Sequence, residues 1–274
     1  MSNLYQIYLI SDSTGETLDR IFLALKAQFN NFNYKTNHFS FTRTENQIIK
    51  ILENCKKKEK TIILYTIVDN KLSKFLNDKA KKERIPCFGV LGDLIESFSN
   101  LLNQDALNVP SRQHIMNDEY YKKIDAIQFT MNHDDGNAIE DIDKSDIILI
   151  GVSRTSKTPT SIYLANKGYK VSNIPIVNKS SIPENVKKNK LKKCIIGLIA
   201  EPERLVEIRK NRMTSLKETG NQKYTSLQKI YEEVKSSKNT FSKFKWPTID
   251  VSRKSVEETA ASVIKIYEIS KKNA

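Results

Sequence analysis

The chain has 274 residues, of which 45 are Lys or Arg and 32 are Asp or Glu, so its formal net charge is +13. Hydrophobic residues make up 39% of the sequence, which excludes disorder throughout, and the length allows one large domain or two ordinary ones. The apolar runs are too short to span a bilayer, and the first residues show no signal peptide. Three widely spaced cysteines, Cys55, Cys87 and Cys194, form neither a disulfide framework nor a zinc-binding spacing. We therefore expect a cytoplasmic protein with reduced thiols and no membrane segment, and no nucleic-acid partner, because the positive charge accompanies no nucleic-acid-binding motif.

The first hundred residues alternate between strand and helix patterns. Strand patterns cover residues 4–10, 34–41, 61–68 and 86–90. Apolar residues at helical spacing follow Leu18, and further helix patterns cover residues 45–56, 70–82 and 94–102. This βαβα alternation predicts an open, mostly parallel sheet covered by helices.

The alternation fails between about residues 103 and 145, where turn-forming and acidic residues gather. We expect a connector there with one helix, around residues 118–127. The alternation then resumes. Strand patterns cover residues 147–150, 169–177 and 193–200, and helix patterns cover residues 158–166, 202–210, 226–237 and 255–269. Pro175 indicates that the strand at 169–177 is an edge strand or has an irregular end. The sequence thus predicts an N-terminal α/β domain over 1–110, a connector over 111–145 and a second α/β domain over 146–274.

A candidate phosphate-binding loop follows the strand at 147–150. It reads Gly151, Val152, Ser153, Arg154, Thr155, Ser156, Lys157 and Thr158. The pattern fits G-x-x-x-x-G-K-[ST] except that Ser156 replaces the second glycine. In such a loop the backbone N–H groups and the helix N-terminus hold phosphates, the lysine reaches the transferring phosphoryl group, and the threonine hydroxyl faces a magnesium ion. We therefore predict a nucleotide site here, with Lys157 and Arg154 as catalytic cations and Thr158 as a magnesium ligand.

The alternative is an ordinary strand–turn–helix connection with a hydroxyl cap. The missing glycine favours that alternative, because the position often needs a positive φ. Ser156 must therefore adopt that backbone conformation, or the loop is distorted. One Arg and one Lys among the hydroxyls favour the phosphate loop, because a cap needs neither.

Two later segments are typical of adenylate-kinase-like enzymes. A strand and helix precede Arg209 and Arg212, which we predict as lid arginines that clamp phosphate oxygens. The alternative is a helix with a basic last turn. Residues 249–259 resemble the last strand, loop and helix of the same kinases, and Ser255 with Glu258 also predicts a capping box. The second domain is therefore expected to be P-loop kinase-like.

Two further motifs allow both a structural and a functional interpretation. Residues 11–16, Ser-Asp-Ser-Thr-Gly-Glu, follow the first strand, where Ser13 and Glu16 predict a capping box and an anion or regulatory site is the alternative. The second motif is His133, Asp134, Asp135 and Gly136. Its carboxylates could hold magnesium or accept a hydroxyl proton during phosphoryl transfer, and His133 could orient the acceptor; the alternative is an Asp-Gly turn.

Taken together, the order and spacing of these motifs resemble the bacterial and plant pyruvate, phosphate dikinase regulatory proteins over nearly the whole chain. The matching segments are residues 11–16, 66–69, 133–136, 151–161, 197–198, 208–212 and 255–260. The resemblance implies a bifunctional enzyme. It uses ADP to phosphorylate a Thr of the dikinase, releasing AMP, and it removes this phosphate with inorganic phosphate, releasing pyrophosphate. Because the family accepts Ser at the second glycine position, Ser156 does not weaken this resemblance.

The resemblance also implies the partner and the residue roles. The protein substrate is pyruvate, phosphate dikinase, which the Ser-Lys-Thr form of the loop favours over phosphoenolpyruvate synthase, the target of a sister group. Asp135 is the candidate acceptor base or magnesium ligand, with Asp134 and His133 beside it. We expect the N-terminal domain to mediate a homodimer or to dock the substrate protein. A small-molecule P-loop kinase is the main rival, and the additional N-terminal domain counts against it.

Overall fold

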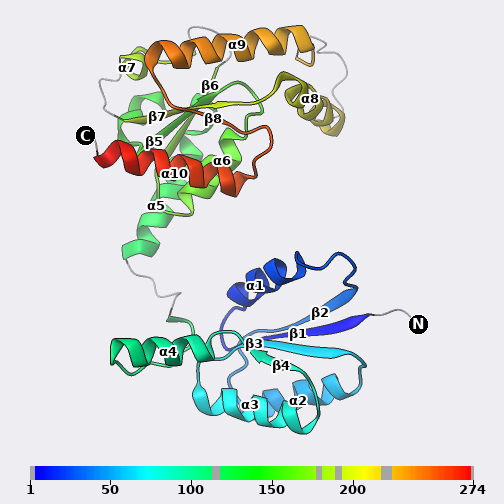
Figure 1. The fold of residues 1–274 in the computed structure, drawn as a ribbon. Coiled ribbons are helices and arrows are strands. Elements are labelled where there is room, and N and C mark those ends of the chain that lie inside the picture. The colour runs from blue at the N-terminus through cyan, green and yellow to red at the C-terminus, as the bar shows by residue number, and fades with distance from the viewer. Residues whose placement is uncertain (1–3, 113–117, 177–180, 189–192, 217–223, 273–274) are drawn as a thin grey trace. The chain divides into compact units, whose positions relative to one another are not determined.

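The computed structural model describes residues 4–112, 118–176, 181–188, 193–216 and 224–272 (Figure 1). It forms two compact units, Met1–Ile115 and Met116–Ala274, each with a four-stranded parallel sheet. The predicted α/β fold class is thus confirmed.

In the first unit the elements are β1 (Tyr5–Ser11), α1 (Glu16–Lys26), β2 (Tyr34–Phe39), α2 (Glu45–Lys56), β3 (Thr61–Thr66), α3 (Asn70–Lys82), β4 (Cys87–Gly89) and α4 (Gly92–Leu102). In the second they are α5 (Asp118–Asn132), η2 (Asp134–Gly136), η3 (Ile139–Lys144), β5 (Ile147–Gly151), α6 (Lys157–Ala165), β6 (Val171–Pro175), α7 (Glu184–Lys187), β7 (Cys194–Ile199), α8 (Pro202–Leu216), α9 (Leu227–Phe244), β8 (Thr248–Asp250) and α10 (Val256–Lys272).

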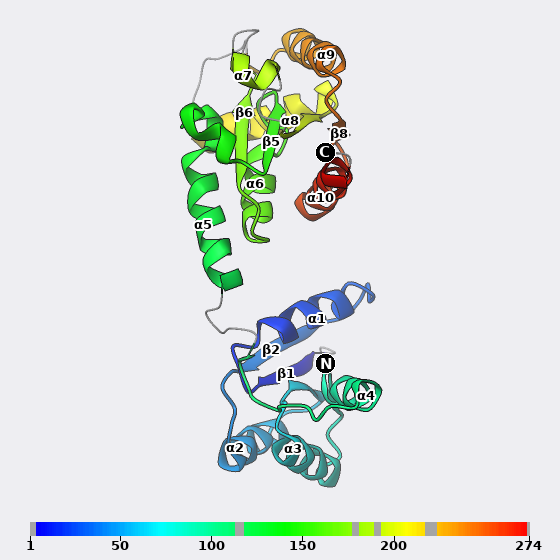
Figure 2. The same cartoon turned by 90° about the vertical axis from the view of Figure 1, so that its left-hand side faces the viewer.

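The sheet of the first unit has the strand order β2-β1-β3-β4. Successive residues of β1 bury their side chains on opposite faces, as a strand covered on both sides requires. Ile7 and Leu9 pack with residues of α1, while Tyr8 and Ile10 pack with residues of α2 and α3. Helices therefore cover both faces, and α1 lies on the opposite side of the sheet from α2 and α3 (Figures 1 and 2).

The sheet of the second unit has the order β6-β5-β7-β8. Ile147 and Leu149 of β5 pack toward residues of α6 and α10, while Ile148 and Ile150 pack toward η3, α7 and the C-terminal part of α9. Gly151 at the end of β5 lies opposite Pro175 of β6 and Leu198 of β7. The carboxyl end of β5 thus lies between β6 and β7, and the predicted phosphate loop begins there.

The predicted elements are confirmed in kind, and several helices extend further than the patterns indicated. The helices expected around 118–127, 202–210 and 226–237 are α5, α8 and α9. Pro175 ends β6, which is an edge strand as expected, whereas the expected strand end at Val177 lies outside the described residues. From Asp118 on, the segment that we expected to be a connector packs on the second unit, because α5 contacts α6 and β6.

The three cysteines are free thiols. Burial raises the pKa of both Cys55 and Cys87 to about 12, so these thiols stay protonated at neutral pH. Within the described parts of the chain, no helix combines the length and apolarity needed to cross a bilayer.

Candidate active site

The phosphate loop is the turn that connects β5 to α6. Arg154 and Ser156 have φ values of 74° and 56°, in the left-handed region. Ser156 thus adopts the conformation that a glycine usually supplies at this position. At Gly151 a Cβ atom would lie 2.6 Å from the carbonyl oxygen of Leu198 and 2.7 Å from the Thr155 hydroxyl, so only glycine fits. Ser156 therefore meets the backbone requirement that the missing second glycine raises, and phosphate binding by this loop stays a prediction.

Two side chains of the loop fold back onto it. Thr155 Oγ1 and Lys157 Nζ both donate to the carbonyl oxygen of Val152, at 2.9 and 3.0 Å. Lys157 is only 5% exposed. Burial lowers the pKa of its ammonium to about 8, and the carboxylates of Asp135 and Asp134 partly oppose that shift. Lys157 forms no ion pair with any described residue, so an anion within the loop would supply a direct countercharge.

The motif of residues 133–136 lies between α5 and η3. His133 is buried, stacks on Phe129 with ring centroids 3.7 Å apart, and places Nδ1 2.8 Å from the carbonyl oxygen of Phe129. Asp135 is exposed with a φ of 52°, and Gly136 follows with a φ of 80°. Of the two carboxylates, Asp135 is therefore the one that solvent or a substrate reaches freely. We call residues 133–136 the acidic loop.

A direct contact joins the acidic loop to the phosphate loop. Thr158 Oγ1 donates to the Asp134 carboxylate, with distances of 3.0 and 3.2 Å to its two oxygens. Asn173 of β6 is 1% exposed, and its side-chain amide donates to Asp134 and, at 3.0 Å, to Thr158 Oγ1. Its backbone N–H also donates to the carbonyl oxygen of His133 at 3.0 Å. Asn173 thus fixes the acidic loop beside the first turn of α6.

The structure gives the two predicted lid arginines different surroundings. Arg209 is 1% exposed and pairs with Glu233 of α9 at 2.7 Å. Its guanidinium also donates to the carbonyl oxygens of Ser153 and Tyr224, both at 3.2 Å. The Tyr224 hydroxyl lies 3.1 Å from Ser153 Oγ. Arg209 therefore holds the Ser153 carbonyl group of the turn after β5, whereas Arg212 is exposed.

The first unit also has a turn between its first strand and helix, β1 and α1, as the second unit has between β5 and α6. The capping box predicted for Ser13 and Glu16 is wrong: Gly15 caps α1 with a φ of 91°, and no side chain accepts a hydrogen bond there. Ser13 instead accepts a hydrogen bond from the Ser111 hydroxyl at 3.0 Å. The anion site proposed for this turn stays a prediction.

The second predicted capping box, at the start of α10, is confirmed, because the Ser255 N–H donates to Glu258 and the Glu258 N–H donates back to Ser255 Oγ.

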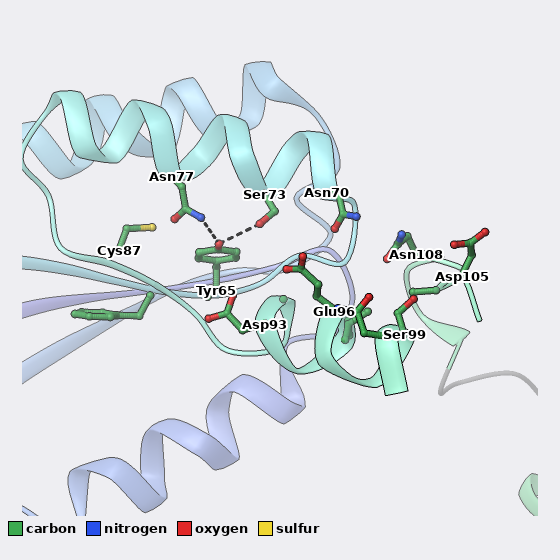
Figure 3. Close-up of a pocket in the computed structure, with 16 residues that line it drawn as sticks. Tyr65, Asn70, Ser73, Asn77, Cys87, Asp93, Glu96, Ser99, Asp105 and Asn108 are labelled. Carbon is green, nitrogen blue, oxygen red and sulfur yellow. Dashed lines mark hydrogen bonds between the residues drawn. The ribbon is translucent and has the colours of Figure 1, made fainter. Parts of the chain in front are cut away.

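A separate cavity of about 770 Å³ lies in the first unit between α3, β4 and α4 (Figure 3). The hydroxyl of Tyr65 at its wall accepts from Asn77 at 2.6 Å and lies 3.0 Å from Ser73 Oγ. The carboxylates of Asp93, Glu96 and Asp105 also line it. No residue of the predicted phosphate site lines this cavity. No sequence pattern indicated it, because residues from four separate elements line it.

The catalytic candidates thus gather in the second unit. Lys157, Thr158, Asp134 and Asp135 come from two segments that flank β5 and are joined by hydrogen bonds. No group of three or more His, Cys, Asp or Glu side chains within the described residues could hold a metal ion alone. The Thr158 hydroxyl and the Asp134 carboxylate nevertheless offer two oxygen donors of the kind that Mg²⁺ takes together with substrate phosphates. These features define a parallel α/β protein with a candidate phosphate loop and a neighbouring carboxylate pair.

Comparison with known proteins specifies the family. A family model described as kinase/pyrophosphorylase matches residues 7–264, and the chain belongs to this family. A protein of Pelagibacter ubique (strain HTCC1062) is 66% identical over the full length of both chains. Proteins of Wolbachia sp. subsp. Brugia malayi (strain TRS) and Erythrobacter litoralis (strain HTCC2594) are 43% and 41% identical, over 95% of this chain and 96% and 93% of theirs. All three carry the name of a pyruvate, phosphate dikinase regulatory protein, so the resemblance seen in the sequence motifs is confirmed.

Proposed function

We propose that this protein regulates pyruvate, phosphate dikinase by phosphorylating one of its threonines with ADP and by removing that phosphate with inorganic phosphate. The names of the relatives support the target, and the kinase/pyrophosphorylase family supports a phosphotransferase. The observation that carries the proposal is the hydrogen bond from Thr158 to Asp134, which holds the acidic loop beside the phosphate loop. A phosphoryl group in the loop would then lie near an exposed carboxylate.

In the kinase direction the phosphate loop holds the β-phosphate of ADP. The oxygen of the target threonine attacks that phosphorus, the bond from the phosphorus to the bridging oxygen breaks, and AMP leaves with the bridging oxygen. The hydroxyl proton passes to a carboxylate. Phosphoryl transfer depends mainly on positioning and charge neutralisation, which the loop amides and Lys157 supply.

In the reverse direction inorganic phosphate takes the place that AMP has left. One of its oxygens attacks the phosphorus of the phosphothreonine, the bond from phosphorus to the threonine oxygen breaks, and pyrophosphate forms. The threonine oxygen recovers a proton from the same carboxylate. One anion-binding loop therefore serves both reactions, so a lesion in it reduces both.

The hydrogen bonds divide the roles of the two carboxylates. Asp134 accepts from Thr158 and Asn173, so its oxygens are already engaged. Asp135 is exposed, and its carboxylate influences Lys157 electrostatically. We assign proton transfer to Asp135. Asp134 and Thr158 are the candidate magnesium ligands, and the ion would neutralise phosphate charge when bound.

His133 and Arg209 have supporting roles in this proposal. The buried imidazole of His133 stacks on the ring of Phe129 in α5, and we assign it the role of orienting the acidic loop. Arg209 is engaged with the Ser153 carbonyl group, so we assign direct phosphate contacts to Arg154 and Arg212. A planar guanidinium suits that contact because it can hold two phosphate oxygens.

The first unit has an exposed apolar face on and just beyond α4. Helix α4 buries no residue, and Leu94, Phe98 and Leu101 are 56%, 61% and 80% exposed. Leu107 and Val109, just beyond the helix, are 67% and 53% exposed. An apolar surface of this extent is typical of protein interfaces, and we propose that a second copy of the chain covers it.

The experiment that tests this function mixes the purified protein with purified pyruvate, phosphate dikinase and ADP. The expected result is a phosphothreonine on the dikinase, seen by mass spectrometry, together with one AMP per phosphate transferred. Phosphoenolpyruvate synthase replaces the dikinase in a parallel reaction, and a third reaction offers small acceptors alone. Phosphorylation of the synthase only, or turnover without a protein acceptor, would contradict the proposed target.

A further inference from the structure

Tyr224 lies just before α9 begins at Leu227, and its side chain contacts the candidate phosphate loop. Its hydroxyl lies 3.1 Å from Ser153 Oγ, so one of the two hydroxyls donates to the other. Tyr224 is half-buried, and it is distant in sequence from residues 151–158. A residue outside the loop thus forms a hydrogen bond with one of the loop's own side chains.

Arg209 of α8 holds Tyr224 at two further points. Its guanidinium donates to the Tyr224 carbonyl oxygen at 3.2 Å, and the guanidinium carbon lies 4.7 Å from the centre of the tyrosine ring. A cation over an aromatic ring is attracted by the negative face of that ring. Arg209 is itself buried and paired with Glu233 of α9 at 2.7 Å. Both the backbone and the ring of Tyr224 are therefore fixed beside Ser153.

The same guanidinium orients the backbone of the loop. Arg209 donates to the Ser153 carbonyl oxygen at 3.2 Å. Because a peptide group is planar and trans, the N–H of Arg154 points to the side opposite that carbonyl. The carbonyl oxygen of Gly151 is likewise engaged, by the N–H of Ile176 at 3.0 Å. Residues outside the loop therefore help to set the direction of its amide N–H groups, the groups that would hold a phosphate.

The contact between the two hydroxyls gains a direction when an anion is present. An ionised phosphate oxygen accepts hydrogen bonds but donates none, whereas each hydroxyl can donate one and accept two. If Tyr224 donates to Ser153 Oγ, the proton of Ser153 remains for the phosphate. The phenol is the more acidic of the two hydroxyls and suits the outer position, and a chain of hydrogen bonds polarises its members and strengthens each of them.

We propose that Tyr224 is a positioning residue for phosphate binding and that it acts through the Ser153 hydroxyl. The inference rests on the proposed function and adds to it a residue from outside the candidate phosphate loop. Arg209 keeps Tyr224 in place, Tyr224 orients Ser153, and Ser153 donates to the phosphate. Because one loop serves both reactions in the proposed function, Tyr224 contributes equally to the binding of ADP and of inorganic phosphate.

The test is Tyr224→Phe, which removes the hydroxyl but keeps a ring over Arg209. Calorimetry measures the dissociation constants of ADP and of inorganic phosphate with no protein acceptor present. Both should rise by about threefold to tenfold, as expected for the loss of one hydrogen bond. The kcat with the dikinase should stay within about twofold, because the lost interaction is made before and during the transfer alike. The matched control is Tyr231→Phe, an exposed tyrosine of α9, which should change neither constant.

A double-mutant cycle shows whether Tyr224 acts through Ser153. Ser153→Ala alone should weaken both ligands at least as much as Tyr224→Phe does. Adding Tyr224→Phe to Ser153→Ala should then change each dissociation constant by less than about twofold. Factors that multiply would mean that the two hydroxyls act independently, which overturns the proposal. A purely structural defect would lower the number of binding sites per chain and leave the dissociation constants unchanged.

The outcomes separate the role of Tyr224 from the proposed function. Unchanged dissociation constants in Tyr224→Phe, a rise for one ligand only, or an equal rise in Tyr231→Phe also overturns the proposal. If the cycle behaves as expected but the unmodified protein transfers no phosphate to the dikinase, the proposed target fails while the role of Tyr224 stands. If the unmodified protein binds neither ADP nor inorganic phosphate, the candidate phosphate loop fails, and the role of Tyr224 fails with it.

Discussion

Thr158 Oγ1 donates to the Asp134 carboxylate at 3.0 Å, although the two residues lie 24 positions apart on either side of β5. This bond joins the candidate phosphate loop to a loop that carries carboxylates. Asp134 is engaged in it, and we propose the neighbouring, exposed Asp135 as the group that accepts the proton.

The first prediction concerns that division of roles. Asp135→Asn should lower both the kinase and the phosphorylase rates by about a hundredfold or more, because a base is lost at an exposed position that makes no structural contact with Thr158. The measurement is single-turnover kinetics with the dikinase in each direction. The control is Asp143→Asn, an exposed carboxylate of η3. Rates within about threefold of the unmodified protein in Asp135→Asn would show that another group takes the proton.

The second prediction concerns Asn173, whose amide holds Asp134 and Thr158 together. Asn173→Ala should lower kcat by roughly tenfold or more while the KM for ADP changes little, because the acidic loop loses its position but the phosphate loop remains. Ser172→Ala is the matched control, since Ser172 is equally buried on β6 and binds Ser145 instead. Hydrogen exchange should show faster exchange of residues 133–137 in the Asn173 variant only. Unchanged exchange there would mean that Asn173 does not fix the acidic loop.

The third prediction is a dependence of stability on pH. The pKa of Lys157 is lowered to about 8 by burial, whereas the same lysine in the unfolded chain titrates near 10.5. Between these values the unfolded chain binds more protons than the folded chain, so the free energy of unfolding contributed by this group rises with pH. Relative to Lys157→Met, the unmodified protein should gain on the order of 3 kcal/mol between about pH 7 and about pH 11. Urea unfolding measures the difference, and a constant difference across this range would contradict the burial of a charged ammonium.

The fourth prediction concerns the apolar face of α4. Phe98→Glu should convert the dimer to monomer, because it places a charge at the centre of the proposed interface. Analytical ultracentrifugation measures the mass, and Leu23→Glu on α1 is the control, since Leu23 is 60% exposed outside this face. A dimer that persists in Phe98→Glu, or dissociates equally in Leu23→Glu, would exclude α4 as the dimer contact.

The sequence predicted the local features of the site but not the contacts between distant segments. The loop at residues 151–158 could be proposed from the sequence because its residues are consecutive. The left-handed φ that this interpretation requires of Ser156 is observed, and phosphate binding itself stays a prediction. The prediction of a capping box at Ser13 was wrong because α1 begins after Gly15, whose φ is positive, with no side-chain cap. A pattern of four residues cannot distinguish a glycine cap from a serine cap.

The remaining features depend on tertiary packing. Asn173 lies 39 residues after Asp134, and their contact exists only because β6 pairs with β5 beside the acidic loop. Arg209 is buried against Glu233 of α9, a contact that the basic sequence pattern around it does not indicate. Its predicted role as a lid arginine stays a prediction.

The most direct measurement uses ADP labelled in its β-phosphate. With the dikinase as acceptor, the label should move to a threonine, and added unlabelled inorganic phosphate should then release it as pyrophosphate. Lys157→Ala should abolish both transfers together, because one loop holds the phosphoryl group in each direction. Transfer in either direction that persists at the unmodified rate in Lys157→Ala would contradict a single phosphate loop as the site of both reactions.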